Sequence, residues 1–235
     1  MIQDSNLRKV RRRRRPRLTA RHKLQRKQFC EDWISKNRNW RKVVWSDEKK
    51  FRLDGPDAYN YYLVEVNKEA PEDVLSMDYQ RYKGVMIWMA ISSKGVLYFC
   101  LVRGSINGDT YMNIVCNHAL PMIHIAHGSS FGFQQNNATC HKRLDVLGAF
   151  ELLGMDVMEW PACSPDLYPI ENVWSIVARR VYANIAAFDD EEQLWKKIGQ
   201  EITDLKTEEI LPFVESIEKR IVKCAENKYS YVNKW

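Results

Sequence analysis

The first candidate for chemistry is Asp47, an acid in an otherwise apolar row of a predicted strand. Residues 43–53 alternate with a period of two, so Asp47 shares a face with Val43, Trp45, Phe51 and Leu53, whereas Glu48 is expected to point outwards. A buried carboxylate is costly unless it is paired or bound to a metal ion. Asp47 is therefore a candidate metal ligand, and the alternative is a local ion pair with Lys49, which interrupts the same row.

The second candidate is Glu171, near the start of a helix predicted over residues 169–182. Pro169 suits the first helical position, because the N–H that proline lacks would be unpaired there. Glu171 then falls in the first turn, beside the apolar stripe formed by Ile170, Val173, Trp174, Val177 and Val181. It can either reach a site along the core edge or simply stabilise the helix N-terminus as an acid.

The hydrophobic pattern predicts a scaffold of mixed strands and helices around these acids. A helix over 20–37, capped by Thr19, precedes the strand at 43–53, which ends in a turn at 54–57. The remaining expected elements are a hairpin over 84–102 turning at 92–95, helices over 108–127 and 140–153, short strands at 131–135 and 155–160, and tail helices around 189–204 and 207–226. This order favours an α/β fold with a mixed sheet flanked by helices.

The charge is concentrated at the N-terminus. Residues 1–27 hold twelve of the 36 Lys and Arg but only one of the 30 acids, so the rest of the chain carries a net charge of −5. We interpret residues 1–19 as a basic arm or linker and residues 20–235 as one domain. Such an arm is typical of nucleic-acid contact or nuclear import, and the alternative is a solvated tail. The candidate DNA-binding residues are Arg11, Arg12, Arg13, Arg14, Arg15 and Arg17.

Composition argues against several other classes of protein. No apolar run reaches the roughly 18 residues that a membrane span needs, and no apolar stretch of the secretory type follows the first residues. The six cysteines form no Cys-x-x-Cys pair, which disfavours zinc sites and disulfide frameworks. We therefore expect reduced, mostly buried thiols in an intracellular protein.

Four segments resemble the catalytic domain of Tc/mariner transposases, in the DDE superfamily with an RNase H-like fold. They are VVWSDEKKFRLDGPD, GVMIWMAISSKG, FGFQQNNATCH and WPACSPDLYPIENVW, and they occur in the family order over most of residues 17–183. The resemblance implies a five-stranded RNase H-like sheet, DNA transposition and integration, and metal-dependent phosphodiester cleavage and strand transfer. By the same resemblance, Met1 falls in the linker, and we expect no counterpart of the family's N-terminal helix-turn-helix region.

The resemblance assigns the first catalytic acid to Asp47 and the last to Glu171, with Asn136 at the position of the second aspartate. The 34 residues between positions 136 and 171 fit the spacing of the Tc branch. A site with two Mg²⁺ or Mn²⁺ ions is implied, in which Asp47 bridges both ions and Glu171 holds one.

Asn136 predicts a defective nuclease, because an amide has no charge. A unit-charge pair at about 4 Å is worth roughly 4 kcal/mol at an effective dielectric near 20. A loss of even about 2.7 kcal/mol would lower metal occupancy about a hundredfold. Two further departures from the family are consistent with impaired activity: Tyr168 replaces a helix-capping Asn, and Met89 replaces a Gly. Asp145 is expected to lie too far away to compensate.

Other residues near the motifs have weaker assignments. Asn137 is interpreted as orienting its neighbour through its amide, and His141 either as approaching a phosphate or as a helix-surface residue. Asp166 is interpreted as a turn former, and the basic cluster over 38–52 as DNA-contacting or as a solvated face. The expected partners are DNA and a second copy of the chain, with no membrane and no small-molecule substrate, in the nucleus. The alternatives are a non-catalytic DNA-binding remnant and an interaction module.

Overall fold

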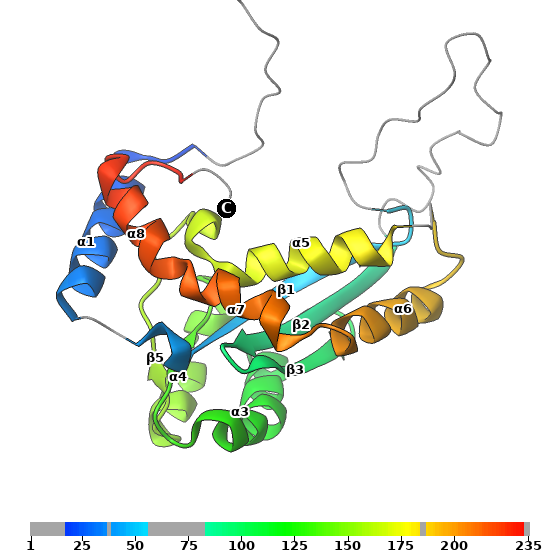
Figure 1. Ribbon diagram of the computed structural model, residues 1–235. Helices are drawn as coiled ribbons and strands as arrows, with labels where there is room; N and C mark the ends of the chain where they lie inside the picture. The colour runs from blue at the N-terminus through cyan, green and yellow to red at the C-terminus, as the bar shows by residue number, and fades with distance from the viewer. Residues whose placement is uncertain (1–16, 37–38, 56–82, 184–186, 233–235) are drawn as a thin grey trace, which may run out of the picture.

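The computed structural model describes residues 17–36, 39–55, 83–183 and 187–232 (Figure 1). Within these residues a single five-stranded sheet forms the centre of the fold, in the order β3-β2-β1-β4-β5. The strands are β1 (Val43–Arg52), β2 (Gly84–Ser92), β3 (Gly95–Val102), β4 (Gly132–Gln134) and β5 (Asp156–Val157). The first three strands pair antiparallel, whereas β4 runs parallel to both β1 and β5. The expected mixed sheet is therefore confirmed.

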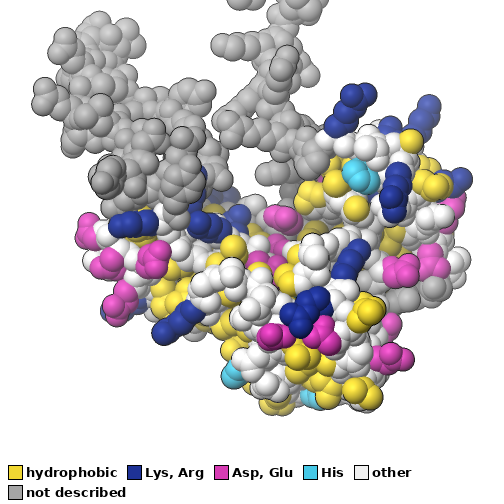
Figure 2. Space-filling view, turned by 180° about the vertical axis from the view of Figure 1, so that it is seen from behind, with side chains coloured by type: hydrophobic (Ala, Val, Ile, Leu, Met, Phe, Trp, Pro, Cys, Tyr) yellow, Lys and Arg dark blue, Asp and Glu magenta, His cyan; other side chains and the backbone are white. Residues whose placement is uncertain are grey.

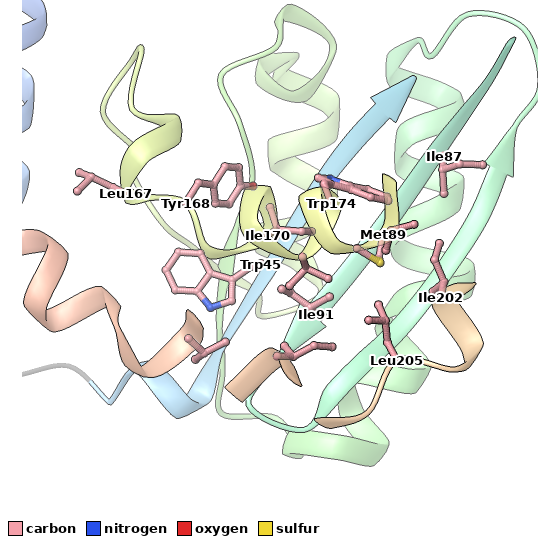
Figure 3. Close-up of a cluster of buried hydrophobic side chains, with 14 of the residues drawn as sticks. Trp45, Ile87, Met89, Ile91, Leu167, Tyr168, Ile170, Trp174, Ile202 and Leu205 are labelled. Carbon is pink, nitrogen blue, oxygen red and sulfur yellow. The ribbon is translucent and has the colours of Figure 1, made fainter. Parts of the chain in front are cut away.

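Helices cover both faces of the sheet (Figure 1). On one face lie α5 (Pro169–Val181), α6 (Glu191–Thr203) and α7 (Thr207–Glu215), which share a core with Trp45 and Met89 (Figure 3). On the other face lie α2 (Gly108–Met112), a π-helical segment at Asn113–Ala119, α3 (Leu120–His127) and α4 (Leu144–Leu152). The two cores take alternate residues of β1, as the period-two pattern predicts.

Helices from the two ends of the described chain lie side by side. Helix α1 (Ala20–Lys36) packs against α8 (Ile217–Glu226), as Figure 1 shows. The buried guanidinium of Arg26 joins them: it donates to the backbone carbonyls of Tyr229 and Ser230 and to both carboxylate oxygens of Asp166, at 2.8 to 3.1 Å. Thr19 caps α1 as predicted, since its hydroxyl accepts from the N–H of His22.

Four predicted elements differ from the structure in length or continuity. The helix expected over 108–127 contains the π-helical segment, and the strand expected over 155–160 is only two residues long. The helix expected over 140–153 is interrupted by the extended backbone of Arg143, between a 3-10 turn at Thr139–Lys142 and α4. The helix expected over 207–226 divides at Ser216, whose hydroxyl donates to the carbonyl of Phe213 and so competes with regular helical bonding.

Two predictions from composition, on membrane spans and on cysteines, can be compared with the structure. In the described residues, no helix is both long enough and apolar enough to cross a bilayer. All six cysteines are free, but only Cys30 and Cys224 are buried and the other four are half-buried, so the expectation of mostly buried thiols was wrong.

Candidate active site

Asp47 lies in the middle of β1, opposite Met89 of β2, and its side chain faces α5. The residue is 9% exposed. Each carboxylate oxygen accepts one hydrogen bond, Oδ1 from Nδ2 of Asn136 at 3.1 Å and Oδ2 from the indole nitrogen of Trp174 at 3.2 Å. The alternative of a local pair with Lys49 is not favoured, because the Lys49 ammonium lies over the ring of Phe51.

Carboxylates gather around Asp47. Burial raises the pKa of Asp47 to about 8, and the nearby carboxylates of Glu171 and Glu48 contribute to the same shift. Glu171 thus lies within electrostatic reach of Asp47, as its place beside the apolar stripe of α5 allows. This crowding of negative charge would be relieved by a bound cation.

The start of α5 is fixed to β1 by Tyr168. Its hydroxyl donates to the backbone carbonyl of Ser46, the residue before Asp47. Tyr168 is the N-cap residue of α5 and makes no side-chain cap, as predicted from the sequence. Because Pro169 then begins the helix, Glu171 lies in the first turn, next to the strand that carries Asp47.

Asn136 reaches both faces of β1 because β4 ends early. The parallel pairing matches Trp45 with Gln134, the last residue of β4, so Asn136 follows just beyond the end of the strand. Its Nδ2 donates to Oδ1 of Asp47 and, at 3.2 Å, to Oε2 of Glu48. The expectation that Glu48 points outwards was wrong: its side chain is only 11% exposed, because helices cover that face of the sheet too.

The orientation of the Asn136 amide is determined by a second contact. Its Oδ1 accepts from the backbone N–H of Ala138 at 3.0 Å, so the NH₂ group must face the carboxylates. A reversed amide would place hydrogens against the Ala138 N–H and an oxygen against two carboxylates. The amide therefore presents a donor at the position that the sequence resemblance assigns to a catalytic aspartate, which could only accept when ionised.

His141 is buried, so its interpretation as a helix-surface residue was wrong. Its ring stacks on Tyr111 with a centroid distance of 3.7 Å, and its Nε2 lies 3.2 Å from Oε1 of Glu48. Gln135 holds this arrangement, because it accepts from the Tyr111 hydroxyl and donates to the His141 carbonyl. His141 thus contacts the acidic site through Glu48.

The remaining sequence candidates have other contacts. The Asn137 amide donates to the carbonyl of Trp160 rather than to Asn136, so it connects two loops. Asp166 lies in a 3-10 turn, as interpreted, and also pairs with Arg26. Asp145 is exposed and bonded to Arg143 at 3.0 Å, and its inability to compensate for Asn136 stays a prediction.

The basic residues are dispersed over the described body. Arg41 pairs with Glu215 and Arg52 with Asp54, so these two belong to local ion pairs, while Arg38 lies outside the described residues. Figure 2 shows Lys and Arg side chains interspersed with acids over one face of the molecule. Arg17 is exposed, and the arm residues Arg11, Arg12, Arg13, Arg14 and Arg15 lie outside the described residues.

Comparison with known proteins identifies the family to which the chain belongs. Residues 42–195 match the family described as DDE superfamily endonuclease. The chain belongs to this family. Its DDE domain is of the Tc/mariner transposase type. It is 33% identical over 220 residues to the Tc3 transposase of Caenorhabditis elegans and 29% identical over 169 residues to the Tc1 transposase of the same species.

The alignments cover 93% and 69% of this chain, but only 65% and 62% of the Tc3 and Tc1 transposases. The chain therefore spans about two thirds of the length of these relatives. The chain also has the fold of a protein chain in the crystal structure of a pre-cleavage Mos1 transpososome. The TM-score is 0.79 at 22% identity, over 98% of this chain and 69% of that one. The Mos1 catalytic domain solved with raltegravir and Mn gives a TM-score of 0.73 at 19% identity, over 93% of this chain and all of that one. The predicted RNase H-like fold is confirmed.

The donor set can be tested against the divalent ions found in such solved relatives, which include Mos1 structures with Mn and with Mg. Asp47 and Glu171 supply hard oxygen donors whose charges repel, but among the described residues no three or more Asp, Glu, His or Cys side chains are grouped so that they could hold a metal ion. Asn136 does not fit as a ligand in its present orientation. Sequence reasoning placed Glu48 outside the site and treated Trp174 only as core. The one signal for Glu48 was its adjacency to Asp47 in the sequence.

Proposed function

We propose that this chain is a DDE transposase domain that engages DNA and whose phosphodiester cleavage is impaired by Asn136. Asp47 and Glu171 are the catalytic acids and cation ligands in this proposal. Its substrate is DNA, its location is the nucleus, and a second copy of the chain is its proposed assembly partner. Family membership supports the transposase ancestry, and the contacts of one amide support the impairment.

The observation that carries the proposal is the direction of the Asn136 amide. Its N–H group points at Asp47 and Glu48, while the oxygen is engaged by Ala138. A carboxylate at this position could accept from Ala138 with one oxygen and present the other to a cation. The amide cannot do both, because its second polar atom is a donor.

The other residues of the site have roles that follow from their contacts. Trp174 and Tyr168 hold Asp47 and the start of α5 in register, so that Asp47 and Glu171 converge. A bound Mg²⁺ or Mn²⁺ would activate the attacking oxygen and stabilise the leaving oxygen of a phosphodiester. Asp47 and Glu171 would hold and orient that ion, whereas Asn136 would add no charge to balance a second one.

The basic arm supports DNA binding independently of cleavage. Residues 11–15 are five consecutive arginines in a chain whose remainder, from residue 28 on, is net negative. Arginines that neutralise phosphates release counterions and so supply sequence-independent affinity. DNA binding without efficient cleavage is therefore the behaviour we expect of this chain.

The test is nicking of supercoiled plasmid in Mg²⁺ or Mn²⁺ by the full chain and by Asn136→Asp. The expected result is that Asn136→Asp nicks at least about a hundredfold faster, since a loss of about 2.7 kcal/mol in cation binding corresponds to that factor. Asn117→Asp is the matched control, because it adds a carboxylate at an exposed helical position where the amide donates to the side chain of Asn113. Adding Asp47→Ala to the faster variant should abolish nicking.

Equal nicking by the wild-type chain and Asn136→Asp would contradict the proposed impairment. Nicking that survives Asp47→Ala would contradict the assignment of the site. If neither chain nicks but both bind DNA, the remaining defect lies beyond Asn136.

A further inference from the structure

Two buried cysteines meet where helices α1 and α8 lie side by side (Figure 1). Cys30 of α1 and Cys224 of α8 are both 0% exposed and belong to the same hydrophobic core. The thiol of Cys30 donates a hydrogen bond to the sulfur of Cys224. The two sulfur atoms are therefore neighbours in space, although they come from opposite ends of the described chain.

The guanidinium of Arg26 is a second contact of the Cys224 sulfur. Its Nη2 donates to Sγ of Cys224 at 3.2 Å. Arg26 lies one helical turn before Cys30, so one face of α1 presents both groups to α8. The guanidinium also donates to both carboxylate oxygens of Asp166, at 2.8 and 2.9 Å, which fixes its position. The structure thus holds a cation and a second thiol against the sulfur of Cys224.

These contacts give the two thiols unequal acidity. The hydrogen bond from Cys30 and the charge of Arg26 lower the pKa of Cys224, against the opposing effect of burial. The bond to Cys224 and burial raise the pKa of Cys30. One thiol is therefore activated as a thiolate, while a protonated thiol lies beside it. A thiol of lowered pKa next to a second thiol that can resolve it is typical of redox-sensitive cysteines.

An oxidant can reach the pair through a local opening of the chain. Helix α8 ends at Glu226, two residues after Cys224, so Cys224 lies in the last turn of the helix. Helix ends open at a lower free energy than the strands of a central sheet. Hydrogen peroxide is small and uncharged, and a brief opening of this turn exposes the sulfur of Cys224 to it.

We propose that Cys30 and Cys224 form a redox-sensitive modification site, at which a peroxide joins them in a disulfide that links α1 to α8. The Cys224 thiolate attacks one oxygen of the peroxide. The S–O bond forms, the O–O bond breaks, and hydroxide leaves and takes up the proton that Cys224 released. The sulfur of Cys30 then attacks the sulfenic sulfur of Cys224. The S–S bond forms, the S–O bond breaks, and the leaving hydroxide takes the proton of Cys30 to become water.

The reaction is balanced, because the two sulfurs lose two electrons and the peroxide gains them and becomes two water molecules. The product closes a long loop, from the helix after the basic arm to the last helix of the described chain. Such a bond constrains the unfolded state and stabilises the folded one when the native geometry is kept. In a reducing compartment, disulfides are characteristic of reversible redox sensing.

The test is treatment of the full chain with hydrogen peroxide, with and without urea, followed by alkylation of the remaining thiols and peptide mass spectrometry. In the folded chain we expect the peptides of Cys30 and Cys224 to be joined with the loss of two hydrogens, and dithiothreitol to restore both thiols. In urea the fold no longer selects this pair, so other pairs of cysteines should also be joined. Cys30→Ser should stop the oxidation at a Cys224 sulfenic acid, which dimedone traps.

Cys100→Ser is the matched control, because it removes a half-buried thiol of β3 and should leave the Cys30–Cys224 bond unchanged. The second measurement is urea unfolding of the oxidised and reduced forms of each chain. Oxidation should raise the urea midpoint of the wild-type chain and of Cys100→Ser, but not that of Cys30→Ser.

Oxidation of the folded chain that leaves Cys30 and Cys224 unjoined, or joins other cysteines as often, would overturn the proposal. A bond that forms but lowers the urea midpoint would also overturn it, because closure would then distort the packing of α1 on α8. The test uses neither DNA nor a metal ion, so its failure would leave the proposed function untouched.

Discussion

The indole nitrogen of Trp174 donates to Oδ2 of Asp47 at 3.2 Å, and this bond connects the helix that carries Glu171 to the strand that carries Asp47. Trp174 is itself 1% exposed and packs against Phe51 of β1. The same side chain is therefore part of the core and a positioning residue of the site. Its place three residues after Glu171 means that one helix brings both groups to β1.

Replacing Trp174 by Phe should destabilise the chain by about 2 to 3 kcal/mol, because a buried hydrogen bond to a carboxylate is lost together with part of the packing. The measurement is unfolding in urea followed by far-UV circular dichroism. Trp195→Phe is the control, since that ring packs edge-on against Phe99 in a half-buried position. Equal losses in the two variants would show that the bond to Asp47 adds nothing.

The raised pKa of Asp47 predicts an unusual pH dependence of stability. The folded pKa of about 8 exceeds the ordinary value of 3.8, so the folded state binds the proton more tightly than the unfolded state. Protonation of Asp47 therefore adds to the free energy of unfolding. This stabilisation is complete below about pH 4 and is lost as the pH rises through about 8, with a total on the order of a few kcal/mol. Urea unfolding between pH 5 and 9 should show the decline.

Asp47→Asn is the control for this pH dependence, because it cannot ionise. Its stability should vary less between pH 5 and 9 than that of the wild-type chain. Identical pH profiles for the two chains would refute the coupling between Asp47 and its acidic neighbours.

Much of the fold could be predicted from periodicity and turn chemistry. The period-two row placed Asp47 on the same face as Trp45 and Phe51, and Pro169 marked the start of the helix that carries Glu171. Element continuity was harder to predict, because it depends on tertiary contacts. Arg143 interrupts a helical pattern, and its side chain binds Asp109 as well as Asp145.

The arrangement within the site was less accessible to sequence reasoning. A strand pattern implies that Asp47 and Glu48 point apart, and it gives no sign that β4 ends where Asn136 can reach both. The burial of Glu48 depends on helices that lie more than fifty residues later in the chain. The direction of the Asn136 amide depends on a single backbone N–H, that of Ala138.

Arg26 should be essential for joining the ends of the described chain. Arg26→Ala leaves the 3% exposed carboxylate of Asp166 buried without its partner, and we expect a loss of about 3 kcal/mol or more. The control is Lys27→Ala, which changes the exposed residue next to Arg26. It should change the free energy of unfolding by less than about 0.5 kcal/mol. Denaturant unfolding measures both, and a small loss in Arg26→Ala would contradict this role.

The basic arm should determine the salt dependence of DNA binding. Replacing Arg11 through Arg15 by Ala should reduce the slope of log affinity against log salt by about 4.5, at about 0.9 per phosphate contact. Fluorescence anisotropy with a labelled duplex between 50 and 300 mM KCl is the measurement. As a control, replacing Arg179 and Arg180 on α5, of which Arg180 pairs with Glu209, should have a smaller effect. An unchanged slope in the arm variant would assign DNA binding to the body of the domain.

In the proposed function, the amide of Asn136 silences a DDE site that keeps the acids Asp47 and Glu171. The most direct test is the ratio of Mn²⁺-dependent plasmid nicking rates for Asn136→Asp and the wild-type chain. We predict a ratio of about 100 or more, abolished when Asp47→Ala is added. A ratio near one, with nicking that still depends on Asp47, would contradict the claim and show that the site functions with the amide in place.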